Sequence, residues 1–149
     1  MTSTRVGVVL CLVLMCMAGP ASGTQSAAGV SPEQAERVWL DMERRLNAGD
    51  PATSVTAQDC GKVSTLKSLR YDTPTVLHFK NATQRDVTYY WVDYEGKRSQ
   101  ERTIKAGENQ YVRTYVTHPF VVVDGAGACA AVYMPLAQPG AVTIADDRE

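Results

Sequence analysis

The stretch Val87–Asp124, which reads VTYYWVDYEGKRSQERTIKAGENQYVRTYVTHPFVVVD, decides the fold. Runs rich in β-branched and aromatic residues alternate there with short charged segments, and Gly96 and Gly107 stand at two of the connections. Runs of this kind, bounded by turn residues, are typical of β-strands joined by tight turns. The three strongest runs are Val87–Val92, Tyr111–Tyr115 and Phe120–Val123.

Further strands are predicted on both sides of this stretch, again at close intervals. Asn81-Ala82-Thr83 is a turn and also an N-x-T sequon, so Asn81 has either a turn role or a glycosylation role. The sequence predicts a mainly β fold: a seven-stranded antiparallel β-sandwich over residues 60–145, with one N-terminal α-helix packed on it. The predicted strands are Thr75–Phe79, Asp86–Val92, Arg98–Ile104, Gln110–Val116, Phe120–Asp124, Ala128–Met134 and Ala141–Ile144.

The helix is predicted over residues 31–48. Ser31 is the expected N-cap, Pro32 takes the first helical position, and Gln34 completes a capping box. Gly49 is the expected residue just past the end of the helix. Apolar side chains recur at helical spacing, and we expect this stripe to pack against the sandwich. The stripe consists of Ala35, Val38, Trp39, Met42 and Leu46.

Residues 1–23 have the pattern of a secretory signal peptide. Arg5 precedes the apolar run Val6–Ala18, and the small residues Ala21–Gly23 follow it, so cleavage is expected after Gly23. The apolar run is shorter than the roughly 20 residues that a transmembrane helix needs. We therefore expect a secreted protein, extracellular or periplasmic, with no integral membrane segment after cleavage.

A lipid anchor through Cys16 is the alternative. Met15 disfavours it, because lipoprotein signals usually carry a small residue at that place. On either interpretation, residues 24–50 hold a short leader and the N-terminal helix, ahead of the sandwich.

Two cysteines, Cys60 and Cys129, lie beyond the predicted signal peptide. In an oxidising compartment such a pair predicts a disulfide, with two free thiols as the alternative. The bridge would join residues 69 positions apart. Cys60 follows Asp50–Asp59, whose composition is typical of a loop, and precedes Gly61–Ser68, for which the pattern predicts no element.

Composition and motifs argue against several functional classes. The formal net charge is −1, and removing Arg5 with the signal peptide lowers it by one to −2, so no nucleic-acid partner is expected. No catalytic or cofactor motif is present, and His78 and His118 show no metal-ligand spacing relative to the cysteines. The sequence therefore predicts no enzyme, no cofactor and no metal. The alternative of catalysis rests on His118 acting as a base with a carboxylate such as Asp124.

Strand alternation separates the aromatic residues of the central stretch into two faces. Tyr89 and Trp91 share one face of their strand, opposite Tyr90, and His118 shares a face with Phe120. Aromatic rings beside an imidazole and a hydroxyl suit a pocket for a short polar side chain. This interpretation requires Trp91 and His118 to lie close together. The alternative is that Trp91 is simply a core residue and His118 a turn residue.

Four pieces of the chain stand out as motifs: F-x-N-A-T (Phe79–Thr83), Y-Y-W-V-D-Y-E-G (Tyr89–Gly96), T-I-K-A-G (Thr103–Gly107) and Y-V-R-T-Y-V-T-H-P-F (Tyr111–Phe120). Together they resemble the β-domain family of the von Hippel–Lindau tumour suppressor. The resemblance implies a seven-stranded sandwich with a helix packed on it. It also implies binding of a peptide strand, with a hydroxyproline held in a pocket of Trp, Tyr, Ser, His and Trp.

The resemblance places the ligand-binding residues at Trp91, Thr114, His118, Phe120 and Glu101. Thr114 keeps the hydroxyl of the family's Ser, and Phe120 keeps an aromatic wall in place of the second Trp. Glu101 stands where the family has Tyr, which is the one non-conservative change. The helical α-domain that docks onto elongin C has no counterpart here, so elongin C is not an expected partner.

Taken together, the sequence predicts a secreted module that binds a protein or peptide. The expected ligand is an extended, proline-containing, hydroxyproline-like peptide added along a sheet edge. The first alternative is a structural or cell-envelope accessory domain with no dedicated ligand. An enzyme is the second.

Overall fold

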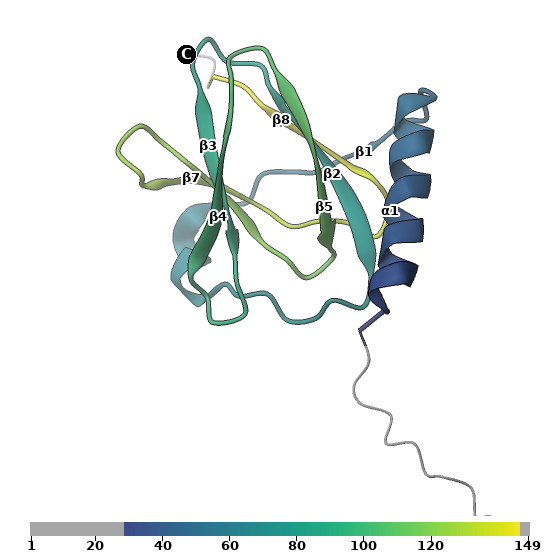
Figure 1. The fold of residues 1–149 in the computed structure, drawn as a ribbon. Coiled ribbons are helices and arrows are strands. Elements are labelled where there is room, and N and C mark those ends of the chain that lie inside the picture. The colour runs from purple at the N-terminus through teal and green to yellow at the C-terminus, as the bar shows by residue number, and fades with distance from the viewer. Residues whose placement is uncertain (1–28, 147–149) are drawn as a thin grey trace, which may run out of the picture.

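The computed structural model describes residues 29–146 (Figure 1), and the predicted signal peptide lies outside the described residues. The fold is mainly β: two four-stranded sheets with an N-terminal helix packed against them. None of the helices among these residues has the length and apolarity needed to cross a membrane. In chain order the elements are α1 (Pro32–Asn47), β1 (Thr53–Ser54), the 3-10 helix η1 (Cys60–Thr65), β2 (Pro74–Asn81), β3 (Val87–Val92), β4 (Arg98–Ile104), β5 (Asn109–Tyr115), β6 (Phe120–Val123), β7 (Cys129–Tyr133) and β8 (Gly140–Ile144).

One sheet has the strand order β1-β8-β2-β5 and the other β4-β3-β6-β7. The second sheet is wholly antiparallel, whereas in the first β8 runs parallel to both β2 and β1. The prediction of seven antiparallel strands was therefore wrong in number and in one orientation. The two residues of β1 lie in the stretch expected to be a loop, and their pairing with β8, not their own pattern, makes them a strand. The chain reaches β8 by crossing from β7 in the other sheet, and such a crossover does not impose the antiparallel pairing that a hairpin does.

The core between the sheets is built around stacked aromatic rings. Phe79 of β2 stacks on Tyr89 of β3 with ring centroids 4.7 Å apart, and Phe120 of β6 meets Phe79 edge-on at 5.8 Å. Leu77 and Val142 complete this cluster from the first sheet. The expected parity of β3 is confirmed, because Tyr89 points into this core while Tyr90 packs on the opposite face.

The outer face of the second sheet is also covered. Its buried residues, which come from β3, β6 and β7, pack against Val63 of η1 and Leu66 just after it. The disulfide Cys60–Cys129 fastens η1 to β7 over a Cα–Cα distance of 5.9 Å, which confirms the predicted bridge. The sequence pattern predicted no element for η1. Only about one residue in each of its turns contacts the sheet, so its apolar residues show no clear periodicity.

The helix follows its sequence signals closely. The Ser31 hydroxyl accepts a hydrogen bond from the backbone N–H of Gln34, and the Gln34 side chain accepts one from the backbone N–H of Ser31, as the capping box predicts. Past the C-cap, Gly49 adopts φ +93°, the left-handed conformation that ends many helices. Figure 1 shows α1 alongside the sheet that contains β2 and β5, away from β7.

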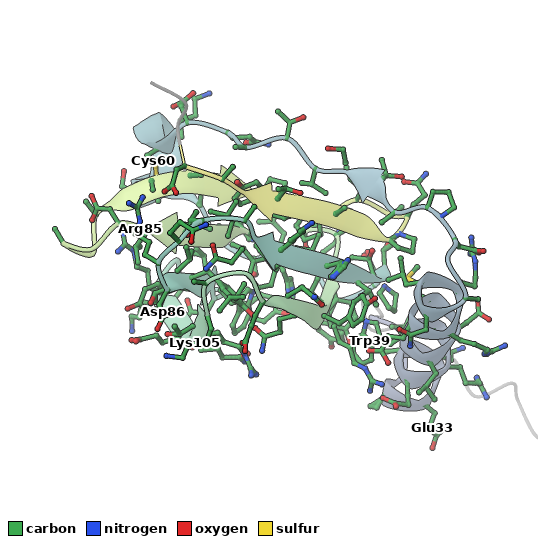
Figure 2. The ribbon with its side chains drawn as sticks, turned by 90° about the horizontal axis from the view of Figure 1, so that it is seen from above. Glu33, Trp39, Cys60, Arg85, Asp86 and Lys105 are labelled. Atoms are coloured by element: carbon green, nitrogen blue, oxygen red, sulfur yellow. A yellow bond between two sulfur atoms is a disulfide. The ribbon has the colours of Figure 1, made fainter. Side chains whose placement is uncertain are left out.

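Asn81, at the end of β2, holds two connections together, the one from β2 to β3 and the one from β4 to β5. Its side chain is fully buried, and its amide nitrogen lies 2.7, 3.0 and 3.1 Å from the carbonyl oxygens of Arg85, Ile104 and Lys105. The Asn81 Oδ1 accepts hydrogen bonds from the N–H and the hydroxyl of Thr83. Figure 2 shows Arg85 and Lys105 at the end of the sandwich far from α1. The structure thus gives Asn81 the turn role, since the folded chain does not present its amide nitrogen as a glycosylation acceptor.

Candidate functional site

A cleft of about 410 Å³ opens between the two sheets on the side where β4 and β5 are the terminal strands. One wall is β3 and β4, the other is β5, and α1 closes the end nearest to it. Its lining residues are Trp39 and Glu43 of α1, Tyr89 and Trp91 of β3, Gln100 and Arg102 of β4, residues 110–115 of β5, and His118 and Phe120 at the start of β6.

Four of the five residues expected from the sequence meet in this cleft: Trp91, Thr114, His118 and Phe120. Glu101 does not line it. The Glu101 carboxylate accepts a hydrogen bond of 2.9 Å from the hydroxyl of Tyr90, on the outer face of the sheet. The neighbouring Gln100 lines the cleft instead.

A β-bulge explains the exchange of Glu101 for Gln100. Tyr89 pairs with Arg102 and Trp91 pairs with Ser99, so two residues of β4 stand opposite the single residue between them on β3. Gln100 has φ +50°, the one non-glycine residue with positive φ in the described chain. A bulge of this kind re-aims the side chains around it. Glu101 was assigned to the site by matching the family's motifs to this chain without gaps, and such a match does not show that β4 carries an extra residue.

The aromatic end of the cleft is formed by Trp91, Tyr115 and His118, and Tyr94, which is not a lining residue, packs against Trp91 and His118. Ring centroids lie 5.2 Å apart for Trp91 and His118 and 5.1 Å apart for Tyr115 and His118. The indole N–H of Trp91 donates to the Ser68 hydroxyl at 2.8 Å, which fixes the orientation of the ring. The Tyr94 hydroxyl lies 3.0 Å from Nε2 of His118. The rings are thus held in place by bonds made behind them, while Trp91 keeps part of its surface exposed.

His118 is a neutral imidazole at this end. Burial lowers the pKa of His118 from 6.5 to about 4, and a hydrogen bond with the backbone of Arg70 only partly opposes this effect. Near neutral pH the ring can therefore offer one donor and one acceptor but no charge. The carboxylate of Asp124 instead accepts the N–H groups of Ala126 and Ala128 in the turn after β6.

Helix α1 contributes a wall that the sequence did not indicate. Trp39 belongs to the predicted apolar stripe, packs edge-on against Tyr115 at 5.4 Å, and also lines the cleft. Its indole N–H donates to the backbone carbonyl of Thr114 at 3.1 Å. Figure 2 shows the Trp39 side chain between α1 and the strands. The Thr114 side chain is buried, and its hydroxyl takes part in no side-chain hydrogen bond among residues 29–146.

The other end of the cleft is polar. The Tyr89 hydroxyl donates to the Gln110 side chain at 2.8 Å, across from one sheet to the other. Burial raises the pKa of Tyr89 to about 12, and the positive charge of Arg102 nearby acts against this rise. Tyr89 is therefore a neutral hydroxyl at any physiological pH.

Arg113 of β5 is tied to the helix by two carboxylates. Its guanidinium makes a paired contact with Glu43, through Nε and Nη2 at 2.7 and 2.9 Å, and its Nη1 lies 2.9 and 3.0 Å from the two carboxylate oxygens of Glu36. These contacts raise the pKa of Arg113, and the same guanidinium lowers the pKa of Glu43. Paired contacts of this geometry fix side-chain orientation as well as adding energy.

The cleft combines aromatic rings with polar groups. These groups are hydroxyls, amides, one neutral imidazole and the charged side chains of Arg102, Arg113 and Glu43. Among residues 29–146 no group of three or more Cys, His, Asp or Glu side chains is placed to hold a metal ion. The disulfide points to an oxidising compartment.

The family model of the VHL beta domain matches residues 66–131, which confirms the resemblance seen in the sequence. This family is a known peptide-binding module. The matched segment contains every residue of the cleft except Trp39 and Glu43, which belong to α1. A search of curated proteins found no match.

Proposed function

We propose, from the VHL beta domain in residues 66–131 and the cleft beside β5, that this protein binds an extended peptide as an added strand. The ligand would pair with the free edge of β5 and place one side chain in the aromatic end of the cleft. The observation that carries the proposal is that this edge and the cleft adjoin.

The edge of β5 has regular backbone groups to offer. Val116 N–H donates to the Thr73 carbonyl, and Asn81 N–H donates to the Glu108 carbonyl, so the even-numbered residues of β5 face β2. The odd-numbered residues Asn109, Tyr111 and Arg113 then direct their N–H and C=O groups towards the open side. An added strand needs this repeat of alternate donors and acceptors.

The other terminal strands are less suited to pairing. β4 is interrupted by its bulge at Gln100, and β1 has only two residues. The edge of β7 is partly occupied, because Gln58 and Val132 exchange backbone hydrogen bonds of 2.8 and 3.0 Å. Bulges and short strands are common means of blunting a sheet edge. β5 is thus the longest uninterrupted edge in the described part of the chain.

The aromatic end suits a compact ligand side chain with a polar edge. Trp91 and Phe120 supply apolar walls, the neutral His118 adds an uncharged ring, and Thr114 supplies a hydroxyl. A proline ring fits such walls, and a hydroxyl on that ring would find a partner in Thr114. Gln100, rather than Glu101, is the adjacent residue of β4, so no carboxylate of β4 opposes the bound ring.

The proposed setting is outside the cytoplasm. The predicted signal peptide and the Cys60–Cys129 bridge both favour a secreted or periplasmic protein, so the ligand would be an extracellular or envelope protein segment. Elongin C is not a proposed partner.

A peptide array tests the proposal. Peptides about ten residues long, with alanine, proline or 4-hydroxyproline at the centre and varied flanks, are probed with the secreted protein. We expect saturable binding of a subset with central proline or hydroxyproline. Thr114→Val should weaken the hydroxyproline peptides by roughly two- to tenfold, the value of one hydrogen bond.

Thr103→Val is the matched control, because Thr103 is exposed on β4 outside the cleft. Its effect on binding should be negligible. No saturable binding across the array would reject the proposal in favour of an accessory domain without a dedicated ligand. Equal weakening by both variants would place the binding surface elsewhere.

A further inference from the structure

The charges that line the cleft are unevenly compensated. Two arginines, Arg102 and Arg113, face it together with one carboxylate, Glu43. Arg113 is fully engaged by Glu43 and Glu36, with side-chain N–O distances between 2.7 and 3.0 Å. The remaining cation of the cleft is Arg102.

Arg102 is exposed, and no carboxylate lies within ion-pair distance of it among residues 29–146. Its neighbours in the cleft are neutral: the Tyr89 hydroxyl and the amides of Gln100 and Gln110. The nearest acid in sequence, Glu101, is turned to the outer face by the bulge and bonded to Tyr90. The fold therefore keeps negative charge away from Arg102.

We propose that the bound peptide carries a carboxylate that pairs with Arg102 at the polar end of the cleft. This inference rests on the proposed function and specifies the class of ligand: an acidic peptide, with its acid at a set spacing from the residue in the aromatic end. Charge complementarity of this kind selects partners and speeds their association more than it adds affinity.

The spacing follows from strand geometry. Gln110, which the Tyr89 hydroxyl reaches, and Thr114 at the aromatic end lie four residues apart on β5, or about 13 Å at 3.3 Å per residue. On β3, Tyr89 is the residue that pairs with Arg102, and it lies two residues, or about 7 Å, from Trp91. Side chains of an extended peptide alternate between faces, so both groups must lie on one face. The acid is therefore expected two or four positions from the residue in the aromatic end.

The test extends the peptide array. Each binding peptide is made with Asp, Asn or Lys at two, three and four positions to either side of the centre, with its C-terminus amidated. One further set of Asn peptides has a free C-terminal carboxylate, which separates a chain terminus from a side chain as the source of the charge. Affinities are measured by fluorescence anisotropy for wild type, Arg102→Gln, Arg102→Glu and Arg98→Gln.

Arg98→Gln is the matched control, since Arg98 lies on the same strand outside the cleft and bonds the Gly127 carbonyl. We expect Asp at an even spacing to bind about two- to fivefold more tightly than Asn, the range of one exposed ion pair. Arg102→Gln should abolish that difference, Arg98→Gln should leave it, and added salt should reduce it. Arg102→Glu should reverse the preference towards Lys, which loss of structure alone would not do.

Peptides that bind with no preference for Asp over Asn, or with a preference that survives Arg102→Gln, would overturn this inference and leave the proposed function standing. A preference seen only with the free C-terminal carboxylate would keep the pairing and assign it to a chain end. Absence of any saturable binding would overturn the proposed function and this inference with it.

Discussion

The buried amide of Asn81 offers a sharp test of how the sandwich is held together, because Asn81→Asp removes its donors without changing its shape. In the wild type the amide nitrogen serves the carbonyls of Arg85, Ile104 and Lys105, which belong to two different connections. In the variant a carboxylate oxygen would face those three carbonyl oxygens at 2.7 to 3.1 Å. The contacts of Thr83 with the other oxygen would persist.

The expected loss of stability follows from counting donors. Each of the two lost N–H donors contributes about 1 kcal/mol net, and carbonyls left buried without a partner cost about 1–3 kcal/mol more. We therefore expect Asn81→Asp to lower the free energy of unfolding by about 3–5 kcal/mol, out of a usual total of roughly 5–15 kcal/mol. Substitutions of this size are uncommon away from the core of a protein.

The loss should also depend on pH. Burial raises the pKa of the introduced carboxyl above its unfolded value of about 3.9. The deficit, meaning the difference in free energy of unfolding between wild type and variant, is then largest above that raised pKa. It shrinks as the pH falls through the raised pKa, because a protonated acid can donate one hydrogen bond. This difference, not the absolute stability of either protein, is the quantity to follow.

Urea unfolding monitored by tryptophan fluorescence, near neutral pH and near pH 4, measures the deficit directly. Gln138→Glu serves as the control, since Gln138 is exposed and the change should alter stability by less than about 0.5 kcal/mol. A deficit for Asn81→Asp below about 1 kcal/mol, or one that grows as the pH falls, would refute this account of the buried amide.

Two further predictions concern stability. The pKa of His118 is about 4 in the folded protein and ordinarily 6.5, so the free energy of unfolding should not depend on this residue above pH 6.5. Between the two pKa values it should fall by up to about 3 kcal/mol as the pH drops. Urea titrations across that range should show that His118→Gln removes this pH dependence and that His78→Gln does not. Replacing both Cys60 and Cys129 by serine should lower the free energy of unfolding by about 4 kcal/mol, the loop-entropy value for a 69-residue separation, and an unchanged urea midpoint would contradict it.

Local signals in the sequence predicted most of the strands, and the structure explains why. Gly96 and Gly107 have φ +82° and +75°, so both mark turns: Gly96 lies in the hairpin between β3 and β4, and Gly107 lies in the turn by which the chain passes from β4 to β5 in the other sheet. Alternation then assigns each residue of β3 to a face, and in the structure both faces pack against other residues. The capping box of Ser31 and Gln34 similarly sets where α1 begins.

Features that depend on partners far along the chain were not predictable in the same way. The strand β1 exists only through β8, and the parallel direction of β8 is set by a crossover between sheets. Trp39 was expected to pack in the helical stripe, but its additional place in the cleft depends on where α1 docks, through Thr114 and Tyr115. Periodicity identifies which face of a helix is buried, not what that face meets.

The bulge at Gln100 links the two properties on which binding would depend. By inserting one residue opposite β3, it breaks the pairing repeat at the edge of β4 and leaves β5 as the regular edge beside the cleft. The same insertion turns the Glu101 carboxylate to the outer face, so Arg102 keeps its charge uncompensated. With Glu101 inside, the cleft would hold two acids against two arginines, and a ligand carboxylate would meet repulsion at the point where it is now expected to pair. The strand edge to which a peptide would add and the charge that this peptide would carry are therefore not independent, because one backbone irregularity in β4 determines both.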